Sequence, residues 1–260
     1  FADSMSTTYA LAKGITAAAM SLAAVPVYLW GRRLVPPAAA LLAAALTLLL
    51  PAFFFSEILM TEAVFLPTFL LAVFAIAYML ERPTLLAQLA ALGAIALAVS
   101  VRVQGIVLLL VIPTAVLIKL LFEVRAGATR AELGAWLRRL WPTAALLVGG
   151  TVLYVFYKLV VSSAPLSSGL GPYSSLAQAH YPFGSTARWS VKHLAELGLA
   201  VGLVPMSSLI VLLWLGLRGA PTTSSERAFL SVVPAALLWV LVETGAFAAT
   251  TTPALPSVPG

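Results

Sequence analysis

The amino-acid sequence predicts an all-α fold, a polytopic transmembrane helical bundle of about eight spans. Of its 260 residues, 62% are hydrophobic and 9% are charged, whereas soluble domains carry about 25% charged residues. The apolar residues form continuous runs, whereas the strands of a transmembrane β-barrel alternate apolar and polar residues. A soluble fold of this length could not bury so much apolar surface, so we expect an integral membrane protein.

Each predicted span is an apolar segment close to the length of about 20 residues that a helix needs to cross a bilayer. The fourth is short, and only a tight turn separates it from the fifth. No internal repeat or domain boundary interrupts the series, so residues 1–260 are expected to form one transmembrane domain. The spans are expected at roughly 8–30, 36–56, 59–80, 84–101, 103–122, 141–162, 194–217 and 228–249, with an outer amphipathic segment at 163–193.

Lysine and arginine residues divide unevenly between the two sides of the predicted bundle. Because cytoplasmic loops are enriched in both residue types, the richer side is expected in the cytoplasm and both ends of the chain outside. The expected location is a bacterial plasma membrane, with the active face outward. The basic excess is therefore interpreted as a topogenic signal, which makes membrane lipid a partner and gives no indication of nucleic acid. Ten of the fifteen basic residues belong to the richer side: Arg32, Arg33, Arg82, Lys119, Arg125, Arg130, Arg138, Arg139, Arg218 and Arg227.

Several kinds of site are disfavoured by what the sequence lacks. It contains no cysteine, which excludes disulfides, thiolate metal sites and cysteine nucleophiles. It contains neither G-x-x-x-x-G-K-[ST] nor G-x-G-x-x-G, so no nucleotide-binding loop is predicted. The centres of the spans hold almost no ionisable residues, which disfavours a proton pump or an ion-coupled transporter. The chain begins without methionine and without a signal peptide, so it is expected to be a fragment of a longer protein.

The stretch "SEILMTEAVF" places Glu57 and Glu62 at the predicted outer membrane boundary. A carboxylate at this depth is costly unless it faces protein or a water-filled cavity, so Glu62 is a candidate ligand for a cation or a polar substrate. Alternatively, Glu62 is a first-turn acid that the helix dipole stabilises. Glu57 lies five residues earlier, about 140° around an ideal helix, and is the weaker candidate.

The stretch "AVSVRVQGIVLL" places Arg102 and Gln104 at the outer turn between the fourth and fifth spans. An arginine at this position can clamp a phosphate or pyrophosphate by two parallel hydrogen bonds, and the amide of Gln104 could add a contact. The alternative is that Arg102 extends to a lipid phosphate at the membrane surface.

The aromatic, amphipathic segment before the seventh span contains Arg188, Lys192 and His193. One interpretation is a helix lying on the membrane surface. The other is a wall over an outer cavity, with these three side chains facing a substrate. His193 and Glu196 form an i,i+3 pair, compatible with metal ligation or with a simple surface contact. Glu62 and His193 are the weak candidates for a metal ligand, because His180 and His193 lack the H-E-x-x-H spacing.

Two further regions carry charges. Glu243 lies near the outer end of the last span and is a minor candidate for the site. On the inner side, "RAGATRAELGAWLRRLWP" is a basic amphipathic stretch, expected to form an interfacial helix that touches anionic lipid.

Three consecutive stretches resemble the C-type membrane glycosyltransferases, the superfamily of the protein O-mannosyltransferases and the aminoarabinose transferases of lipid A. They are "YALAKGITAAAMSLAAVPVYLWGRRL", "LLAAALTLLLPAFFFSEILMTEAVFLPTFLLAVFAIAYMLERP" and "LAALGAIALAVSVRVQGIVLLLVIPTAVLI". The resemblance lies in the order of features: a tyrosine-led span ending in "GRRL", a span ending in proline and aromatics, a threonine–glutamate at the outer boundary, and an "R-x-Q-G" outer turn. It covers roughly residues 8–120, and the remainder fits by topology.

The resemblance implies transfer of a sugar from a polyprenyl-phosphate carrier on the outer face, often with a divalent metal ion. It implies that Glu62 helps to line the sugar or cation site and that Arg102, with Gln104, holds the carrier phosphate. It also implies a catalytic aspartate in an outer loop upstream of this chain, and Asp3 is not equated with it. Two other readings stay open: a transporter or flippase of a lipid-linked or hydrophobic solute, and a membrane scaffold without catalytic activity.

Overall fold

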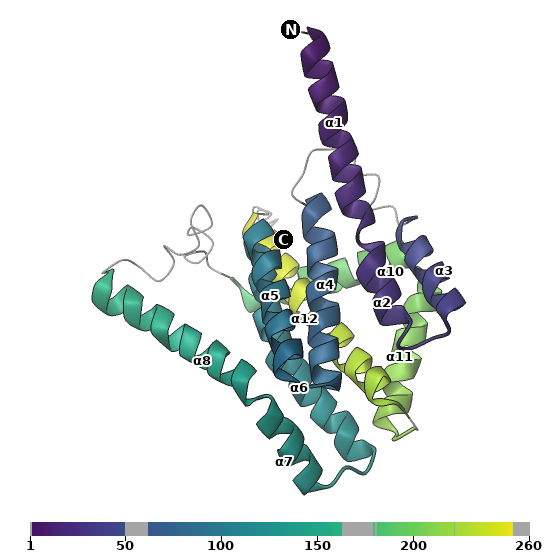
Figure 1. Ribbon diagram of the computed structural model, residues 1–260, viewed down its shortest axis with the longest axis vertical. Coiled ribbons are helices and arrows are strands. Elements are labelled where there is room, and N and C mark those ends of the chain that lie inside the picture. Colours follow the sequence, from purple (N-terminus) through teal and green to yellow (C-terminus); the bar gives the residue numbers. More distant parts are fainter. Residues whose placement is uncertain (1, 50–61, 163–178, 180, 221, 252–260) are drawn as a thin grey trace, which may run out of the picture.

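The computed structural model describes residues 2–49, 62–162, 179, 181–220 and 222–251, and shows an all-helical chain over these ranges (Figure 1). Glu57 and His180 lie outside them, as does most of the predicted outer segment before residue 181. Within the described part there is no β-strand. The helices are α1 (Ala2–Ser21), α2 (Ala24–Gly31), α3 (Pro37–Thr47), α4 (Glu62–Glu81), α5 (Leu85–Val101), α6 (Val107–Arg125), α7 (Arg130–Arg139), α8 (Trp141–Phe156), α10 (Phe183–Val201), α11 (Leu203–Leu217) and α12 (Ser224–Thr251), with the short helical turns η2 (Val103–Ile106) and η3 (Tyr157–Val161).

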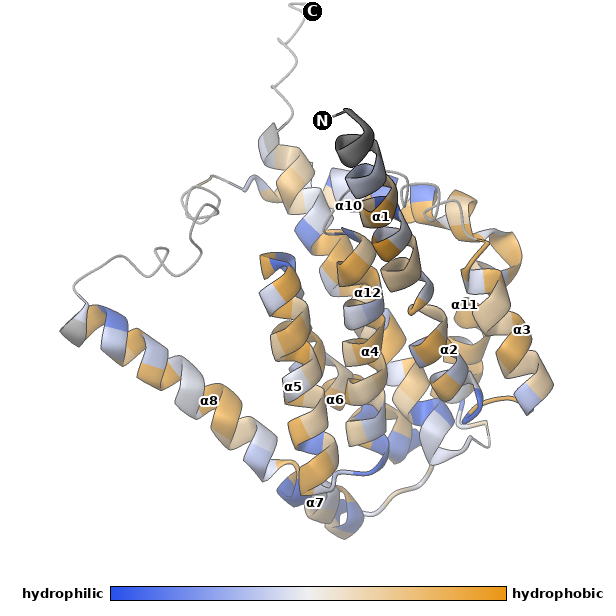
Figure 2. Cartoon of the chain, turned by 45° about the horizontal axis from the view of Figure 1, so that its top comes forward, coloured by the Kyte–Doolittle hydropathy of each residue, from blue (hydrophilic) through white to orange (hydrophobic). Residues whose placement is uncertain are grey.

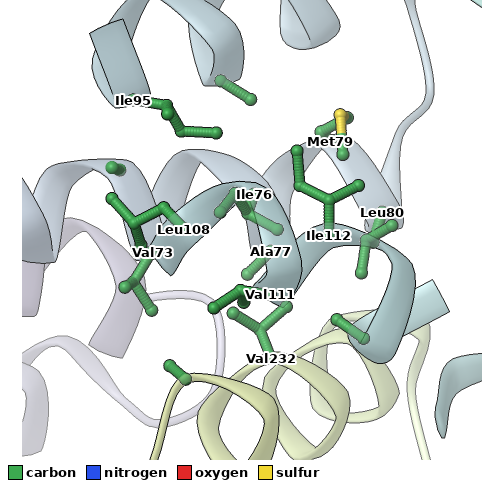
Figure 3. Packing of buried hydrophobic residues seen from close by; sticks show 14 of the residues in the cluster. Val73, Ile76, Ala77, Met79, Leu80, Ile95, Leu108, Val111, Ile112 and Val232 are labelled. Carbon is green, nitrogen blue, oxygen red and sulfur yellow. The ribbon is translucent and has the colours of Figure 1, made fainter. Parts of the chain in front are cut away.

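The centre of the protein is a bundle of α4, α5, α6 and α12, whose facing side chains are fully buried (Figure 3). Ile76, Leu108, Val111 and Val232 interlock there, each with no exposed surface. Alanines line much of the remaining contact. Small residues let helix backbones approach closely, which compensates in lipid for the missing hydrophobic driving force between helices. The alanine-rich composition is therefore what permits this tight bundle.

The two ends of this bundle are polar and its middle is apolar (Figure 2). We call the end where α4 begins and α5 finishes the upper end, and the opposite end the lower end. In Figure 1, α1 begins and α12 finishes on the upper side, while α7 lies at the lower end. An apolar middle between polar ends is the pattern expected of a helical membrane protein.

Five helical segments are long and apolar enough to cross a membrane, and a sixth is possible if the bent pair α10 and α11 counts as one. The sequence predicted about eight spans. The difference comes from α3 and α5, which are apolar but only 11 and 17 residues long, short of the usual length. The five segments are Thr7–Gly31, Glu62–Glu81, Val103–Arg125, Trp141–Val160 and Ser224–Thr250.

Two predicted spans are interrupted where single residues disturb the helix. The predicted span 194–217 breaks at Gly202, whose φ of 94° is a conformation that glycine adopts without strain. As a result α10 and α11 meet at 114°, and α10 begins at Phe183, inside the predicted amphipathic segment. The predicted span 8–30 divides into α1 and α2 around residues 22–23, next to Pro26, which has no backbone N–H to donate.

Helix α8 stands apart from the bundle over most of its length (Figure 1). Only 6% of the apolar stretch within Trp141–Val160 is buried. Its lower end is fixed by Gln88 of α5, which is 2% exposed. The Gln88 Oε1 accepts hydrogen bonds from the Thr143 N–H at 3.0 Å and the Thr143 hydroxyl at 2.7 Å. Its Nε2 donates to the Arg139 carbonyl at 2.9 Å. Gln88 thus caps the first turn of a helix that has no side-chain cap of its own.

Candidate functional site at the upper end of the bundle

The site begins with a break in the helical backbone at Arg102. This residue leaves α5 in an extended conformation, with φ −155° and ψ 128°, and the chain turns through η2 directly into α6. The turn requires Gly105, because a Cβ there would lie 2.8 Å from the Val99 nitrogen and 2.9 Å from the Ala98 carbonyl carbon. The "R-x-Q-G" stretch therefore folds locally so that Arg102 projects from the end of two helices.

The guanidinium of Arg102 joins two of the residues that the sequence singled out. Its Nε donates a hydrogen bond to Oε1 of Gln104 at 3.1 Å. Its Nη1 donates to the carboxylate of Glu62, with which it forms an ion pair. Both side chains keep contact with the surroundings, since Arg102 is 27% and Glu62 46% exposed. Glu62, Arg102 and Gln104 thus form one cluster, although 40 residues separate the first from the second.

Glu62 has the position that the helix-acid interpretation expects, while its role as a ligand for a cation or a polar substrate stays a prediction. It is the first residue and the first-turn acid of α4, where the helix dipole favours a negative charge. It is also the partner of Arg102. The dipole and the guanidinium therefore hold the same carboxylate at the upper end of the bundle.

Glu243 of α12 belongs to the electrostatic surroundings of this cluster. It is half-buried, and Arg102 is the charged group that acts on it. The Trp239 indole N–H donates to the Thr114 hydroxyl at 2.8 Å, which fixes α12 against α6 about one turn below Glu243. Arg102 pairs directly with Glu62, and Glu243 remains a minor candidate for the site.

Helix α10 packs closely on the upper part of α12. The Ser190 hydroxyl donates to the Leu241 carbonyl at 2.9 Å. Where the two helices cross, Gly245 leaves so little space that a Cβ would lie 2.8 Å from the Ser190 nitrogen. Close contact through a glycine is typical of helix pairs in membranes.

The three candidates on α10 are not joined to the Arg102 cluster by any contact between described residues. Arg188 and Lys192 are exposed, and the Lys192 ammonium lies 4.2 Å from the ring centre of Trp189. Nδ1 of His193 lies 2.9 Å from Oε2 of Glu196, which realises the i,i+3 pair. This arrangement is an amphipathic helix with its charged side chains facing away from α12.

The described residues bring together no group of three histidine, cysteine, aspartate or glutamate side chains that could hold a metal ion. Glu62 and His193, the two candidate ligands, have separate partners. Chemically, the cluster offers a guanidinium that can bind an anion and carboxylates that can accept hydrogen bonds from hydroxyl groups.

A second charged network, which sequence reasoning missed, lies at the lower end. Lys119 is only 1% exposed and donates to Glu123 at 2.5 Å, and the Arg227 Nε lies 3.1 Å from the same Glu123 oxygen. Arg33 pairs with Glu81 through two hydrogen bonds of 2.9 and 2.5 Å, and the bonding to Glu81 raises the pKa of Arg33 above its ordinary value. The i,i+4 spacing of Lys119 and Glu123 inside an apolar run was the available signal.

The sequence assigned the ten basic residues of this side only to membrane topology, but the structure also gives four of them carboxylate partners: Arg33, Arg82, Lys119 and Arg227. The described chain thus has a partly exposed charged cluster at its upper end and a more buried charged network at its lower end. No protein-family model, no curated protein and no solved structure matches the chain.

Proposed function

We propose that this integral membrane protein transfers a sugar from a polyprenyl-phosphate carrier to an acceptor on the non-cytoplasmic face of a bacterial plasma membrane. The observation that carries the proposal is the Arg102 cluster: a guanidinium held at a helix break, next to Gln104 and Glu62, at one end of an apolar bundle. An anionic carrier in the membrane would present its phosphate at this depth.

The orientation is part of the proposal. The elements at the lower end carry most of the arginines, including the exposed Arg138 and Arg139 of α7, so we assign this end to the cytoplasm. The upper end, with Arg102, then faces outward, as do both ends of the chain. A count of eight crossings requires α3 and α5 to traverse the membrane as short helices. The 17 residues of α5 reach about 26 Å, slightly less than the hydrocarbon thickness of about 30 Å.

In this proposal Arg102 stabilises the phosphate of the departing carrier. Its Nε and Nη1 have partners, while its Nη2 donates no hydrogen bond to another described residue. A phosphate oxygen reaching Nη2 and displacing Glu62 from Nη1 would gain two parallel charge-assisted bonds. Because negative charge grows on the carrier phosphate as the glycosidic bond breaks, a fixed guanidinium stabilises the transition state more than the ground state.

Glu62 has two roles, one before and one after the substrate binds. Before substrate binds, it holds the guanidinium in place and neutralises it. Once the phosphate replaces it, its carboxylate is free to accept hydrogen bonds from sugar hydroxyls beside the same phosphate. The divalent metal ion that often accompanies such reactions has no ligand set among the described residues, so no step is assigned to it.

The test is a transfer assay with the full-length protein in proteoliposomes, using a radiolabelled polyprenyl-phosphate sugar. We expect Arg102→Gln to lower kcat/KM about a hundredfold. The matched control is Arg138→Gln, which removes the same charge from an exposed position of α7 and should leave transfer unchanged. Normal transfer by the Arg102→Gln variant would refute the phosphate-binding role. If labelled carrier crosses the membrane without losing its sugar, the protein is a flippase and the proposed reaction is wrong.

A further inference from the structure

The lower end of the protein contains a cavity of about 460 Å³ that the proposed sugar transfer does not use. It lies between the end of α6, the turn that follows, the first turns of α7 and the start of α12. Its polar lining is supplied by Lys119, Glu123, Glu132, Trp136, Ser224 and Arg227. Lys119 is buried at its edge and Arg227 is mostly buried, which is uncommon because a buried charge is costly without partners.

The two cations of this cavity carry more hydrogen-bond donors than the described residues can satisfy. A lysine has three N–H groups and an arginine five. Lys119 donates to Glu123 at 2.5 Å, and Arg227 donates from Nη1 to the Thr222 carbonyl. The Arg227 Nε is buried and 3.1 Å from Glu123, yet its N–H is not aligned for a hydrogen bond. Both cations therefore share one oxygen atom of one carboxylate as their ion-pair partner.

The remaining acid of the cavity is already in use. The Oε2 of Glu132 accepts hydrogen bonds from the Thr129 N–H at 2.7 Å and from the Thr129 hydroxyl at 2.8 Å. These bonds belong to the capping box that begins α7. Glu132 is thus held at its own helix end, and the excess of donors around Lys119 and Arg227 persists.

We propose that this cavity binds a phosphate group between Lys119 and Arg227. A phosphate brings several strong acceptor oxygens and a negative charge, and so supplies what the two cations lack. Trp136 forms the facing wall, with the Lys119 ammonium 5.4 Å from its ring centre. The first turns of α7 and α12 open onto the same cavity, and the amino-terminal ends of helices favour anions.

The phosphate can come from an anionic phospholipid headgroup or from solution. The headgroup is favoured by α7, an amphipathic helix whose Arg138 and Arg139 are exposed beside the cavity at the lower end of the bundle. Such a helix lies in the membrane interface and attracts anionic lipid. The cavity would then hold one headgroup of the lipid layer that surrounds it.

The experiment is native mass spectrometry of the detergent-purified full chain, titrated with phosphatidylglycerol and, separately, with phosphatidylcholine. We expect a first phosphatidylglycerol to bind at least tenfold more tightly than phosphatidylcholine. Arg227→Gln should weaken that binding about tenfold, because it removes charge-assisted hydrogen bonds. Arg188→Gln, which removes an equal charge from an exposed position of α10 at the upper end, should change it less than twofold.

A second variant covers the case in which Arg227→Gln fails to fold. Ala128 lines the cavity in the turn before α7, and Ala128→Phe fills the space without touching either cation. It should abolish the first binding event. Equal affinity for both lipids, or unchanged binding by Ala128→Phe, would overturn the proposal. Titration with inorganic phosphate identifies the source: displacement of the lipid supports phosphate from solution, and retention of the lipid supports the headgroup.

Discussion

Replacing Gln88 with leucine should detach the lower end of α8 from the bundle. Gln88 is 2% exposed, and its side chain satisfies the N–H and hydroxyl of Thr143 and the carbonyl of Arg139. In Gln88→Leu the Thr143 hydroxyl can turn to the Met79 sulfur, which lies 3.6 Å away. The Thr143 N–H and the Arg139 carbonyl have no such substitute, so one buried and one part-buried backbone group lose their partners.

A buried group without a partner costs about 1–3 kcal/mol and a part-buried one costs less, so Gln88→Leu should lower the free energy of unfolding by about 1–3 kcal/mol. Because leucine is similar to glutamine in size and shape, the change in packing should contribute less to the loss of stability than the lost hydrogen bonds do. The measurement is reversible unfolding in mixed micelles of a mild detergent and sodium dodecyl sulfate, followed by circular dichroism. The matched control is Gln104→Leu, which makes the same change at a half-buried position of the upper end.

A local measurement separates detachment of α8 from general instability. The chain contains no cysteine, so Leu140→Cys introduces a single thiol at a position that is 7% exposed, next to the start of α8. Its reaction with a maleimide should be slow in the otherwise native chain and much faster after Gln88→Leu. If both the unfolding free energy and the labelling rate stay unchanged, the capping role of Gln88 is refuted.

Three further predictions concern the helix junctions. Gly105→Ala should destabilise the protein by about 1–3 kcal/mol, because its Cβ would overlap the backbone of α5; thermal unfolding in detergent measures this. Gly245→Ala should separate α10 from α12 by forcing Ser190 away, and crosslinking between cysteines introduced on the two helices should fall. Hydrogen bonds from Thr129 lower the pKa of Glu132 below its ordinary value of 4.5. The stabilisation of α7 that Glu132 provides should therefore be complete above pH 4.5 and be lost as the pH falls through the lower folded value.

Each of these has a control and a contradicting result. Gly93→Ala, in α5 with open space around the new Cβ, should be tolerated. An equal loss of stability in Gly93→Ala and Gly105→Ala would show that the overlap of the new Cβ with α5 is not the cause. Unchanged crosslinking between α10 and α12 in Gly245→Ala would contradict the predicted separation of these two helices. Glu132→Gln keeps the capping box but cannot ionise. A loss of α7 helicity at acid pH that is identical in both proteins would show that Glu132 is not responsible.

The sequence predicted those features that depend on local patterns. Long apolar runs predicted an all-helical membrane chain, because a membrane-spanning segment needs continuous apolar surface, but they did not place the breaks within two of the predicted spans. The meeting of Glu62 and Arg102 at one end followed from counting crossings, since each helix reverses the direction of the chain. Glu62 is also the first residue of α4, as its position before an apolar run suggested.

Features set by contacts between distant segments could not be read from the sequence. Gln88 looked like an isolated polar residue in an apolar span, and its role depends on Thr143, 55 residues later. No residue next to Gly202 in the sequence predicts the 114° bend between α10 and α11. Lys119 was assigned to a cytoplasmic edge by its charge, and only the packing of α6, α7 and α12 shows it as buried.

Two of the ion pairs at the lower end differ in when they can form during synthesis. Lys119 and Glu123 are one turn apart on α6, so their charges offset each other as soon as that helix is made, before it meets any other helix. Arg33 and Glu81 are 48 residues apart and come from opposite ends of the segment containing α3 and α4. Arg33 therefore keeps its full charge while the first helices insert, when it can anchor them at the membrane surface, and it is neutralised only once α4 lies beside it.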